Sequence, residues 1–174
     1  VLSFPGGESL TLTGVTLDQL DYATLNAMGI APGTQDGVVD GTAGDDVIDT
    51  GYTDADGDMI DGSDALDGSN DDVIEGGAGD DHIVGGSGDD TMFGGAGSDH
   101  LYARAGADAV DGGAGSDWVR YDGGAAQDMT IDLSTGTAAG GAAEGDPYAN
   151  IENVWADGGV DTIIPHAPHH SPLP

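Results

Sequence analysis

Residues Asp67 to Arg120 form six nonapeptides in unbroken register, which read DGSNDDVIE, GGAGDDHIV, GGSGDDTMF, GGAGSDHLY, ARAGADAVD and GGAGSDWVR. The eighth position is always aliphatic or Met, from Ile74 to Val119. Such a fixed period predicts a repeat architecture, in which each unit buries its apolar residue against its neighbours. The sixth position is always Asp, at Asp72, Asp81, Asp90, Asp99, Asp108 and Asp117.

The composition of the chain favours a hard cation as its ligand. Its 174 residues include 33 Gly, 29 Asp and only 4 Glu. Ca²⁺ takes about 6–8 oxygen ligands at about 2.3–2.6 Å, which Asp carboxylates and main-chain carbonyls can supply. Glycine-rich turns allow the positive φ angles and close backbone approach that such a site needs. We therefore expect calcium at the turns of the repeat.

The charge balance excludes other partners. Lys and Arg number 2 against 33 Asp and Glu, for a net charge of −31. Nucleic acid and anionic membranes are excluded, because binding to either needs a basic face. No apolar run approaches the ~18 residues of a membrane span, and the chain has no Cys for disulfides or thiolate metal sites.

The nonapeptide array resembles the RTX (repeats-in-toxin), or haemolysin-type calcium-binding, family, whose unit reads G-G-x-G-x-D-x-U-x. The resemblance implies an all-β fold, a right-handed parallel β-roll (a β-solenoid). In the family the first six residues of a unit form a calcium-binding turn, the last three form a short strand, and two units complete one coil. The resemblance also implies a secreted or cell-surface bacterial protein, which passes through a type I secretion channel unfolded and folds on external calcium.

On that coil geometry, residues 18 apart stack at about 4.8 Å. Turns 76–81, 94–99 and 112–117 then share one edge, and turns 67–72, 85–90 and 103–108 share the other. One ion between each stacked pair predicts about four Ca²⁺ sites, with further sites open in the flanking repeats. Besides the six position-six aspartates, the predicted ligands are main-chain oxygens of Gly76, Gly77, Gly79, Gly85, Gly86, Gly88, Gly94, Gly95, Gly97, Gly112, Gly113 and Gly115.

The fifth unit departs from the pattern, since Ala103 and Arg104 replace its two leading glycines. A Cβ fits such a turn poorly, and a cation beside the ion opposes binding. We expect the site between turns 85–90 and 103–108 to be the weakest of the four.

Degenerate segments flank the core. Gly41 to Asp49 reads as another repeat, with Asp46 as a further ligand, and an acidic insertion follows. Asp54, Asp56 and Asp58 in that insertion predict a calcium loop of another shape, which lacks the Gly and the closing Glu of an EF-hand. The expected segments are 1–35 (strand and helix, as a cap or the end of a preceding domain), 36–66 (degenerate repeats), 67–120 (roll core), 121–164 (C-terminal β cap) and 165–174 (a Pro/His tail).

The flanks give finer expectations as well. Residues 9–15 predict a strand and residues 16–29 a helix with capping-box spacing at its start. Residues 129–141 predict a strand and turn, and Gly159, Asp161 and Ile163 mark another partial repeat. Tyr148 and Trp155 are expected to pack in the C-terminal cap, because a roll exposes its last core layer.

The sequence also bears on rival functions. It contains no catalytic motif such as G-x-S-x-G, H-E-x-x-H or a Walker loop, so we expect no enzymatic activity in these residues. The alternatives are the non-catalytic part of a larger secreted enzyme, or an adhesive or self-assembling module with a cell-surface partner. His82, His100 and Trp118 are expected to stack on an outward face, as a partner patch or as ordinary solvated surface.

Overall fold

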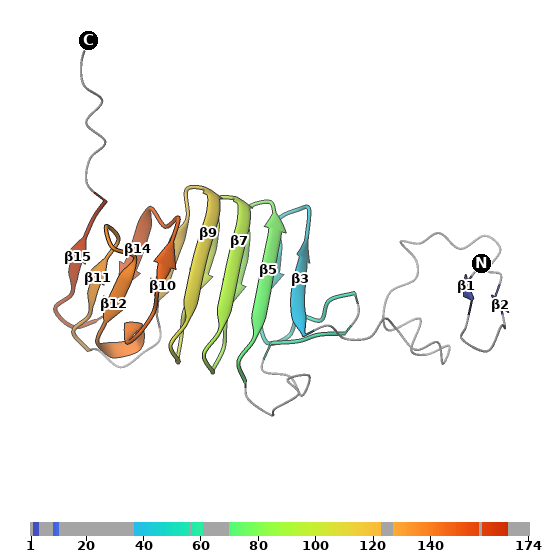
Figure 1. Cartoon of the computed structure of the whole chain (residues 1–174), viewed down its shortest axis with the longest axis horizontal. Coiled ribbons are helices and arrows are strands. Elements are labelled where there is room, and N and C mark those ends of the chain that lie inside the picture. The colour runs from blue at the N-terminus through green and yellow to red at the C-terminus, as the bar shows by residue number, and fades with distance from the viewer. Residues whose placement is uncertain are drawn as a thin grey trace, which may run out of the picture.

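In the computed structural model, the chain forms a roll of stacked parallel strands (Figure 1). The structure describes residues 37–55, 57–60, 70–122, 127–156 and 158–166, and the backbone of two short strands near the N-terminus. These two, β1 (Leu2–Ser3) and β2 (Ser9–Leu10), pair antiparallel. The rest of the predicted strand 9–15 and the predicted helix 16–29 lie outside the described residues, as does the tail beyond residue 166.

Two five-stranded parallel sheets form the two faces of the roll. Sheet 1 contains, in spatial order, β13 (Tyr148–Ala149), β9 (Ala109–Gly115), β7 (Thr91–Gly97), β5 (Val73–Ala78) and β3 (Val38–Thr42). Sheet 2 contains β14 (Asn153–Ala156), β10 (Trp118–Tyr121), β8 (His100–Tyr102), β6 (His82–Val84) and β4 (Val47–Ile48).

The register confirms the predicted coil of two nonapeptides. In sheet 1, Ile74 pairs with Met92 and Met92 with Val110. In sheet 2, His82 pairs with His100 and His100 with Trp118. Each step is 18 residues, so the fold is the parallel β-roll that the repeat predicts.

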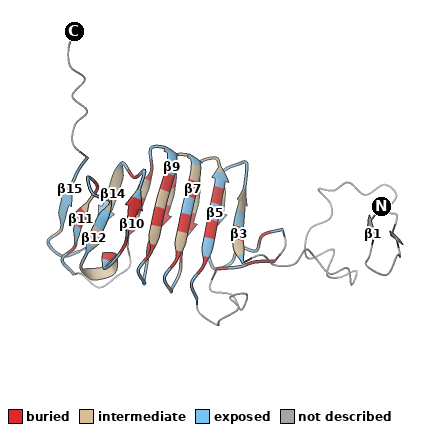
Figure 2. Ribbon diagram, in the orientation of Figure 1, coloured by how far each residue is buried: buried red, intermediate tan, exposed pale blue. Residues whose placement is uncertain are grey.

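The position-eight side chains form the core between the two sheets. Ile74, Ile83, Met92, Leu101 and Val119 are completely buried. Buried and more exposed residues alternate along β5, β7 and β9, which produces the bands in Figure 2. Each unit thus adds one apolar layer, as a period-two strand with one face inward requires.

The strands of sheet 1 are longer than the three residues expected. β5, β7 and β9 continue into their glycine-rich turns, where Gly77 pairs with Gly95 and Gly95 with Gly113. At the other edge of the roll, β8 ends at Tyr102, and only an isolated bridge between Ser87 and Ala105 follows. Arg104 lies between these elements without the positive φ of the glycines at the equivalent position, which explains why the regular pairing stops there.

The acidic insertion closes the N-terminal end of the roll. The backbone N–H of Asp46 donates to Asp81 Oδ1. These two residues are 35 apart in the sequence, whereas equivalent residues of regular coils are 18 apart, so this coil contains an insertion of 17 residues. Tyr52 packs against the core, and Ile60 is buried in it. These two residues of the described part of the insertion therefore contact the hydrophobic core.

The C-terminal end carries a small third sheet of β12 (Thr137–Ala139), β11 (Thr130–Asp132) and β15 (Thr162–Ile164). The predicted strand and turn over 129–141 are confirmed by β11 and β12, and a short 3₁₀ helix, Gly141–Ala143, follows. Tyr148 is buried as expected, whereas Trp155 is 50% exposed and packs against the guanidinium of Arg120. In the described part of the chain, no helix is long and apolar enough to cross a membrane.

Candidate metal centre

The position-six aspartates lie inside the roll and connect its coils. All six are less than a tenth exposed. In four of these aspartates, one carboxylate oxygen accepts a hydrogen bond from the backbone N–H of the aspartate one coil earlier. These bonds run from Asp72 N to Asp90 Oδ1 (2.9 Å), Asp81 N to Asp99 Oδ1 (2.8 Å), Asp90 N to Asp108 Oδ1 (3.0 Å) and Asp99 N to Asp117 Oδ1 (2.8 Å).

The second oxygen of four of these carboxylates has no hydrogen-bond partner in the protein. Oδ2 of Asp81, Asp99, Asp108 and Asp117 is buried and accepts no hydrogen bond. A buried, unpaired carboxylate oxygen is costly unless a cation compensates it. The four atoms are therefore the strongest candidates for metal ligands in the described structure.

Glycine makes room for these oxygens beside the neighbouring coil. A Cβ on Gly94 would lie 2.5 Å from Asp99 Oδ2 and 2.6 Å from the carbonyl oxygen of Gly112. A Cβ on Gly76 would similarly lie 2.7 Å from Asp81 Oδ2 and 2.5 Å from the carbonyl oxygen of Gly94. Carboxylate and carbonyl oxygens from successive coils thus converge beside Gly76 and Gly94, and Gly112 has the same surroundings with the carbonyl oxygen of Asn150. Hard oxygens of both kinds are the ligands that Ca²⁺ prefers.

The electrostatics of the site also favour a cation. Burial is the main cause that raises the pKa of Asp81, Asp99, Asp108 and Asp117, while the backbone N–H on each Oδ1 lowers it in part. Repulsion from Asp117 raises the pKa of Asp99 further, and repulsion from Asp99 does the same for Asp81. The ionised stack is therefore disfavoured by itself, and a divalent cation would relieve this cost.

A second set of aspartates, which the sequence reasoning missed, lies at position five. Their Oδ1 atoms accept hydrogen bonds from the following coil, in the direction opposite to those of position six. The bonds run to Asp45 from Asp80 N, to Asp71 from Asp89 N, to Asp80 from Ser98 N and to Asp89 from Ala107 N, at 2.8–2.9 Å. The sequence feature that could have identified the position-five aspartates is the change from G-D-D in the earlier units to G-S-D and G-A-D in the later ones.

The irregular fifth unit keeps its aspartate in place. Asp108 is fully buried and reaches the N–H of Asp90 like its equivalents. Arg104, however, turns its guanidinium over the ring of Tyr102, 5.9 Å from the ring centroid. The expectation that this site is the weakest stays a prediction.

Residues from outside the array complete both edges at the C-terminal end. Asp146 Oδ1 accepts the N–H of Asp108, and Glu152 Oε2 accepts that of Asp117. The hydroxyl of Tyr121 donates to Asp146 Oδ2 at 2.6 Å, so both Asp146 oxygens are engaged. The sequence reasoning missed these acids, because they follow their partners by 38 and 35 residues rather than by 18.

The predicted ligands nearer the N-terminus have varied surroundings. Asp46 Oδ2 accepts hydrogen bonds from the backbone N–H and the hydroxyl of Thr42. Asp54 accepts backbone N–H groups of Gly57, Asp58 and Asp40, which is the behaviour of a turn residue.

Asp58 Oδ2 accepts the N–H of Gly37, whereas Asp56 lies outside the described residues. Across the described ranges, no three His, Asp or Glu side chains gather as a metal site. A site in this roll would instead combine one carboxylate per turn with carbonyls of the glycines, such as Gly76, Gly94 and Gly112.

One comparison with known proteins finds a similarity in this part of the chain. A family model described as the RTX calcium-binding nonapeptide repeat (4 copies) matches residues 66–101, 84–119 and 93–127. Neither curated proteins nor solved structures give a significant match. The matched region contains the buried Oδ2 atoms described above.

Proposed function

Residues 66–127 are RTX calcium-binding repeats, and from this premise we propose that the chain is a secreted module that folds on binding Ca²⁺. Its role is structural and coupled to secretion, within an extracellular bacterial protein, and the module itself is not catalytic. The observation that carries the proposal is the set of four buried Oδ2 atoms without a protein partner. Proteins with RTX repeats are typically extracellular, which supports the proposed location.

Calcium binding and folding are coupled in this proposal. Each candidate site takes oxygens from two coils, and the coils are brought together only in the folded chain. Ligand that binds only the native state adds its binding free energy to the stability of the fold. In calcium-poor cytosol the chain would therefore stay expanded and competent for export, and external calcium would fold it.

The proposed sites number about four, two along each edge, because an ion lies between successive turns. Along one edge the pairs are Asp81–Asp99 and Asp99–Asp117, and along the other they are Asp72–Asp90 and Asp90–Asp108. The glycines predicted from the sequence would contribute main-chain oxygens between them.

A calcium titration of the chelator-treated chain tests the proposal. Far-UV circular dichroism should change from an unfolded to a β spectrum as Ca²⁺ reaches about 10⁻⁴–10⁻³ M, the range of extracellular modules. Small-angle scattering should show compaction over the same range. Mg²⁺ at equal concentration should fail, because it demands octahedral geometry and retains its waters. A β spectrum that persists in chelator, or an equal response to Mg²⁺, would refute the proposal.

A further inference from the structure

The outer face of sheet 2 differs from the rest of this acidic chain. The outward positions within its strands carry no carboxylate, although the chain has 33 Asp and Glu; Asp49, which follows β4 at the position equivalent to Val84, and Asp122, which is bonded to Arg120, lie at the margins of this face. The outer face of sheet 1 carries Asp40, Glu75 and Asp111 on its strands. We call the residues at the outward positions of sheet 2 the aromatic face: Val47, His82, Val84, His100, Tyr102, Trp118, Arg120, Asn153 and Trp155.

The side chains of the aromatic face hold one another in place. The ring of His82 lies 4.4 Å from that of Tyr102, and the ring of His100 lies 6.0 Å from that of Trp118. The guanidinium of Arg120 lies between two rings, 4.9 Å from the centroid of Tyr102 and 5.1 Å from that of Trp155. Cation–π and ring contacts of this kind fix side chains before a ligand arrives, which lowers the entropic cost of binding.

The face also offers polar groups beside its rings. Arg120 Nη1 lies 3.4 Å from His100 Nδ1, and Arg120 Nη2 lies 3.2 Å from Asp122 Oδ2. Asn153 Nδ2 lies 3.2 Å from Ser116 Oγ. Trp155 remains 50% exposed in spite of its contact with Arg120. Aromatic rings beside a few fixed polar groups are the side chains that small-ligand sites use for contact and orientation.

Its dimensions and charge narrow the class of ligand. Five strands about 4.8 Å apart, four of them with two outward residues and β4 with one, give a strip about 20 Å long and about 10 Å wide. A stable protein partner would need about 800 Å² on each side, so the strip is too small for a lasting dimer. A net charge of −31 repels polyanions. A narrow, extended, neutral ligand matches the size of the strip and is not repelled by the net charge.

We propose that the aromatic face binds a neutral, linear, β-1,4-linked saccharide that lies along the roll axis. Such a chain is a flat ribbon, whose pyranose rings present C–H groups to aromatic rings and hydroxyl groups at their edges. Trp155 and Trp118 would stack on the sugar rings, and Arg120, His100 and Asn153 would bond to the hydroxyls.

Intrinsic fluorescence gives a direct test, because Trp118 and Trp155 are the only two tryptophans of the chain. The calcium-loaded protein is titrated with cellohexaose and with chitohexaose, and binding is also followed by calorimetry. We expect at least one of them to shift the tryptophan emission, with a dissociation constant on the order of 0.1–1 mM. No spectral or heat change below about 10 mM for either sugar would overturn the proposal.

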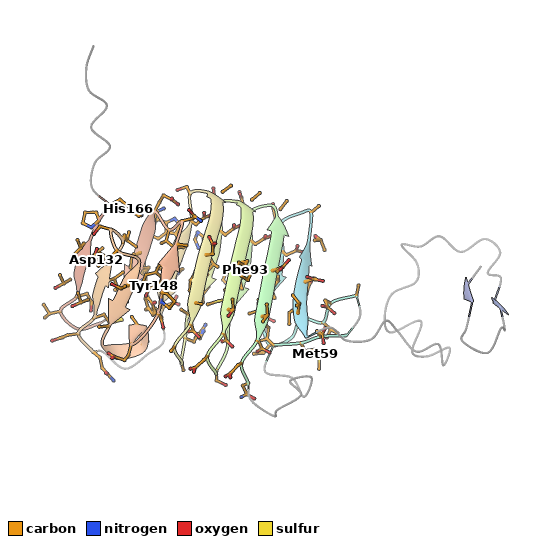
Figure 3. All side chains as sticks on the ribbon, in the orientation of Figure 1. Met59, Phe93, Asp132, Tyr148 and His166 are labelled. Carbon is orange, nitrogen blue, oxygen red and sulfur yellow. The ribbon has the colours of Figure 1, made fainter. Side chains whose placement is uncertain are left out.

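Phe93 provides a matched control on the opposite sheet. It occupies the same outward repeat position on β7 that Trp155 occupies on β14, and it is 39% exposed (Figure 3). Trp155→Ala should weaken binding about tenfold or more, whereas Phe93→Ala should leave it unchanged. Equal losses would overturn the proposal. Trp118→Ala serves as the second variant, should Trp155→Ala fail to fold.

Two further measurements distinguish a neutral saccharide from other possible ligands of the aromatic face. A hexauronate that bound more tightly than the neutral sugars would overturn the neutral class. Sedimentation velocity that showed a dimer abolished by Trp155→Ala would instead assign the face to a second copy of the chain. Each variant is first checked for its calcium-induced β spectrum, so a failure of sugar binding is distinguishable from a failure of calcium-dependent folding.

Discussion

Asp99 shows how one residue serves two neighbouring coils. Its Oδ1 accepts the N–H of Asp81, its own N–H donates to Asp117 Oδ1, and its Oδ2 is buried without a partner. Asp108 has the same local geometry, but its N–H donates to Asp146, whose other oxygen is engaged by Tyr121. Asp99 is therefore flanked by two carboxylates with a free oxygen, and the C-terminal neighbour of Asp108 has none.

Asp99→Asn should consequently damage calcium binding more than Asp108→Asn. We expect the calcium midpoint to rise about threefold or more for Asp99→Asn, with a larger fall in the number of bound ions. Asp80→Asn is the control, since it removes one charge from an exposed position-five residue and retains the acceptor for Ser98 N–H. Calorimetry and circular dichroism measure both quantities. Equal shifts for Asp99→Asn and Asp108→Asn would mean that each ion is held within a single turn.

At this scale the sequence predicted only part of the candidate site. The position-six aspartates are visible because each recurs nine residues after the last. Asp146 and Glu152 cannot be identified from the repeat, because the chain that precedes them first forms the separate strand pair β11 and β12. A periodic pattern can identify equivalent residues only where no insertion shifts their spacing.

At the scale of the elements, the glycines at position four set how closely the turns stack. Gly97 has a φ of +151°, and a Cβ there would collide with the carbonyl of Gly79 in the preceding coil. Gly44 occupies the same position in the flanking repeat Gly41 to Asp49, and there the nearest atom to such a Cβ is Thr42 Oγ1, at 3.9 Å. Gly44 also lacks a positive φ.

Gly97→Ala should therefore destabilise the calcium-loaded roll by about 3 kcal/mol or more, through strained backbone and a backbone clash. Gly44→Ala should cost less than about 0.5 kcal/mol, as for a tolerated surface substitution. Urea denaturation at saturating calcium compares the two. A similar stability for both variants would show that the coils can separate to admit a side chain.

The lengths of the strands show what a consensus repeat cannot predict. The consensus predicts three-residue strands throughout, and sheet 2 largely agrees with it, with strands of two to four residues. In sheet 1 the glycines of successive turns also pair, so β7 and β9 reach seven residues. On the other edge, the departure from the consensus at Ala103 and Arg104 accompanies the loss of this pairing.

At the scale of the whole molecule, the fold class was predictable because the repeat itself encodes register, core and turn. The ends were less predictable, since neither follows the repeat. The insertion after Asp49 closes one end with Tyr52 and Ile60, residues that carry no repeat signal. At the other end, Ile163 stacks on Ile131 as the partial repeat suggests, yet Ile163 stays 45% exposed.

The buried acids also give the whole molecule a pH dependence whose sign changes with calcium. Burial raises the pKa of Asp81, Asp99, Asp108 and Asp117 above the ordinary 3.8, and that of Asp146 to about 6. The folded roll without calcium therefore binds more protons than the unfolded chain. The stability that protonation contributes is complete below pH 3.8 and is lost as the pH rises toward and through about 6.

The chelated chain should accordingly gain β-structure as the pH falls from 7 to about 4. Calcium reverses the sign, because it binds only ionised carboxylates, so its midpoint concentration should rise over the same interval. Circular dichroism across pH, in chelator and at fixed calcium, measures both effects. Acidification also reduces the repulsion among all the carboxylates, which by itself would favour compaction. The variants Asp99→Asn and Asp80→Asn separate this general effect from protonation of the buried carboxylates. Asp99→Asn should reduce the calcium-free pH response more than the exposed Asp80→Asn. A chelated chain that loses strand on acidification, or equal responses of the two variants, would show that the buried carboxylates do not control the transition.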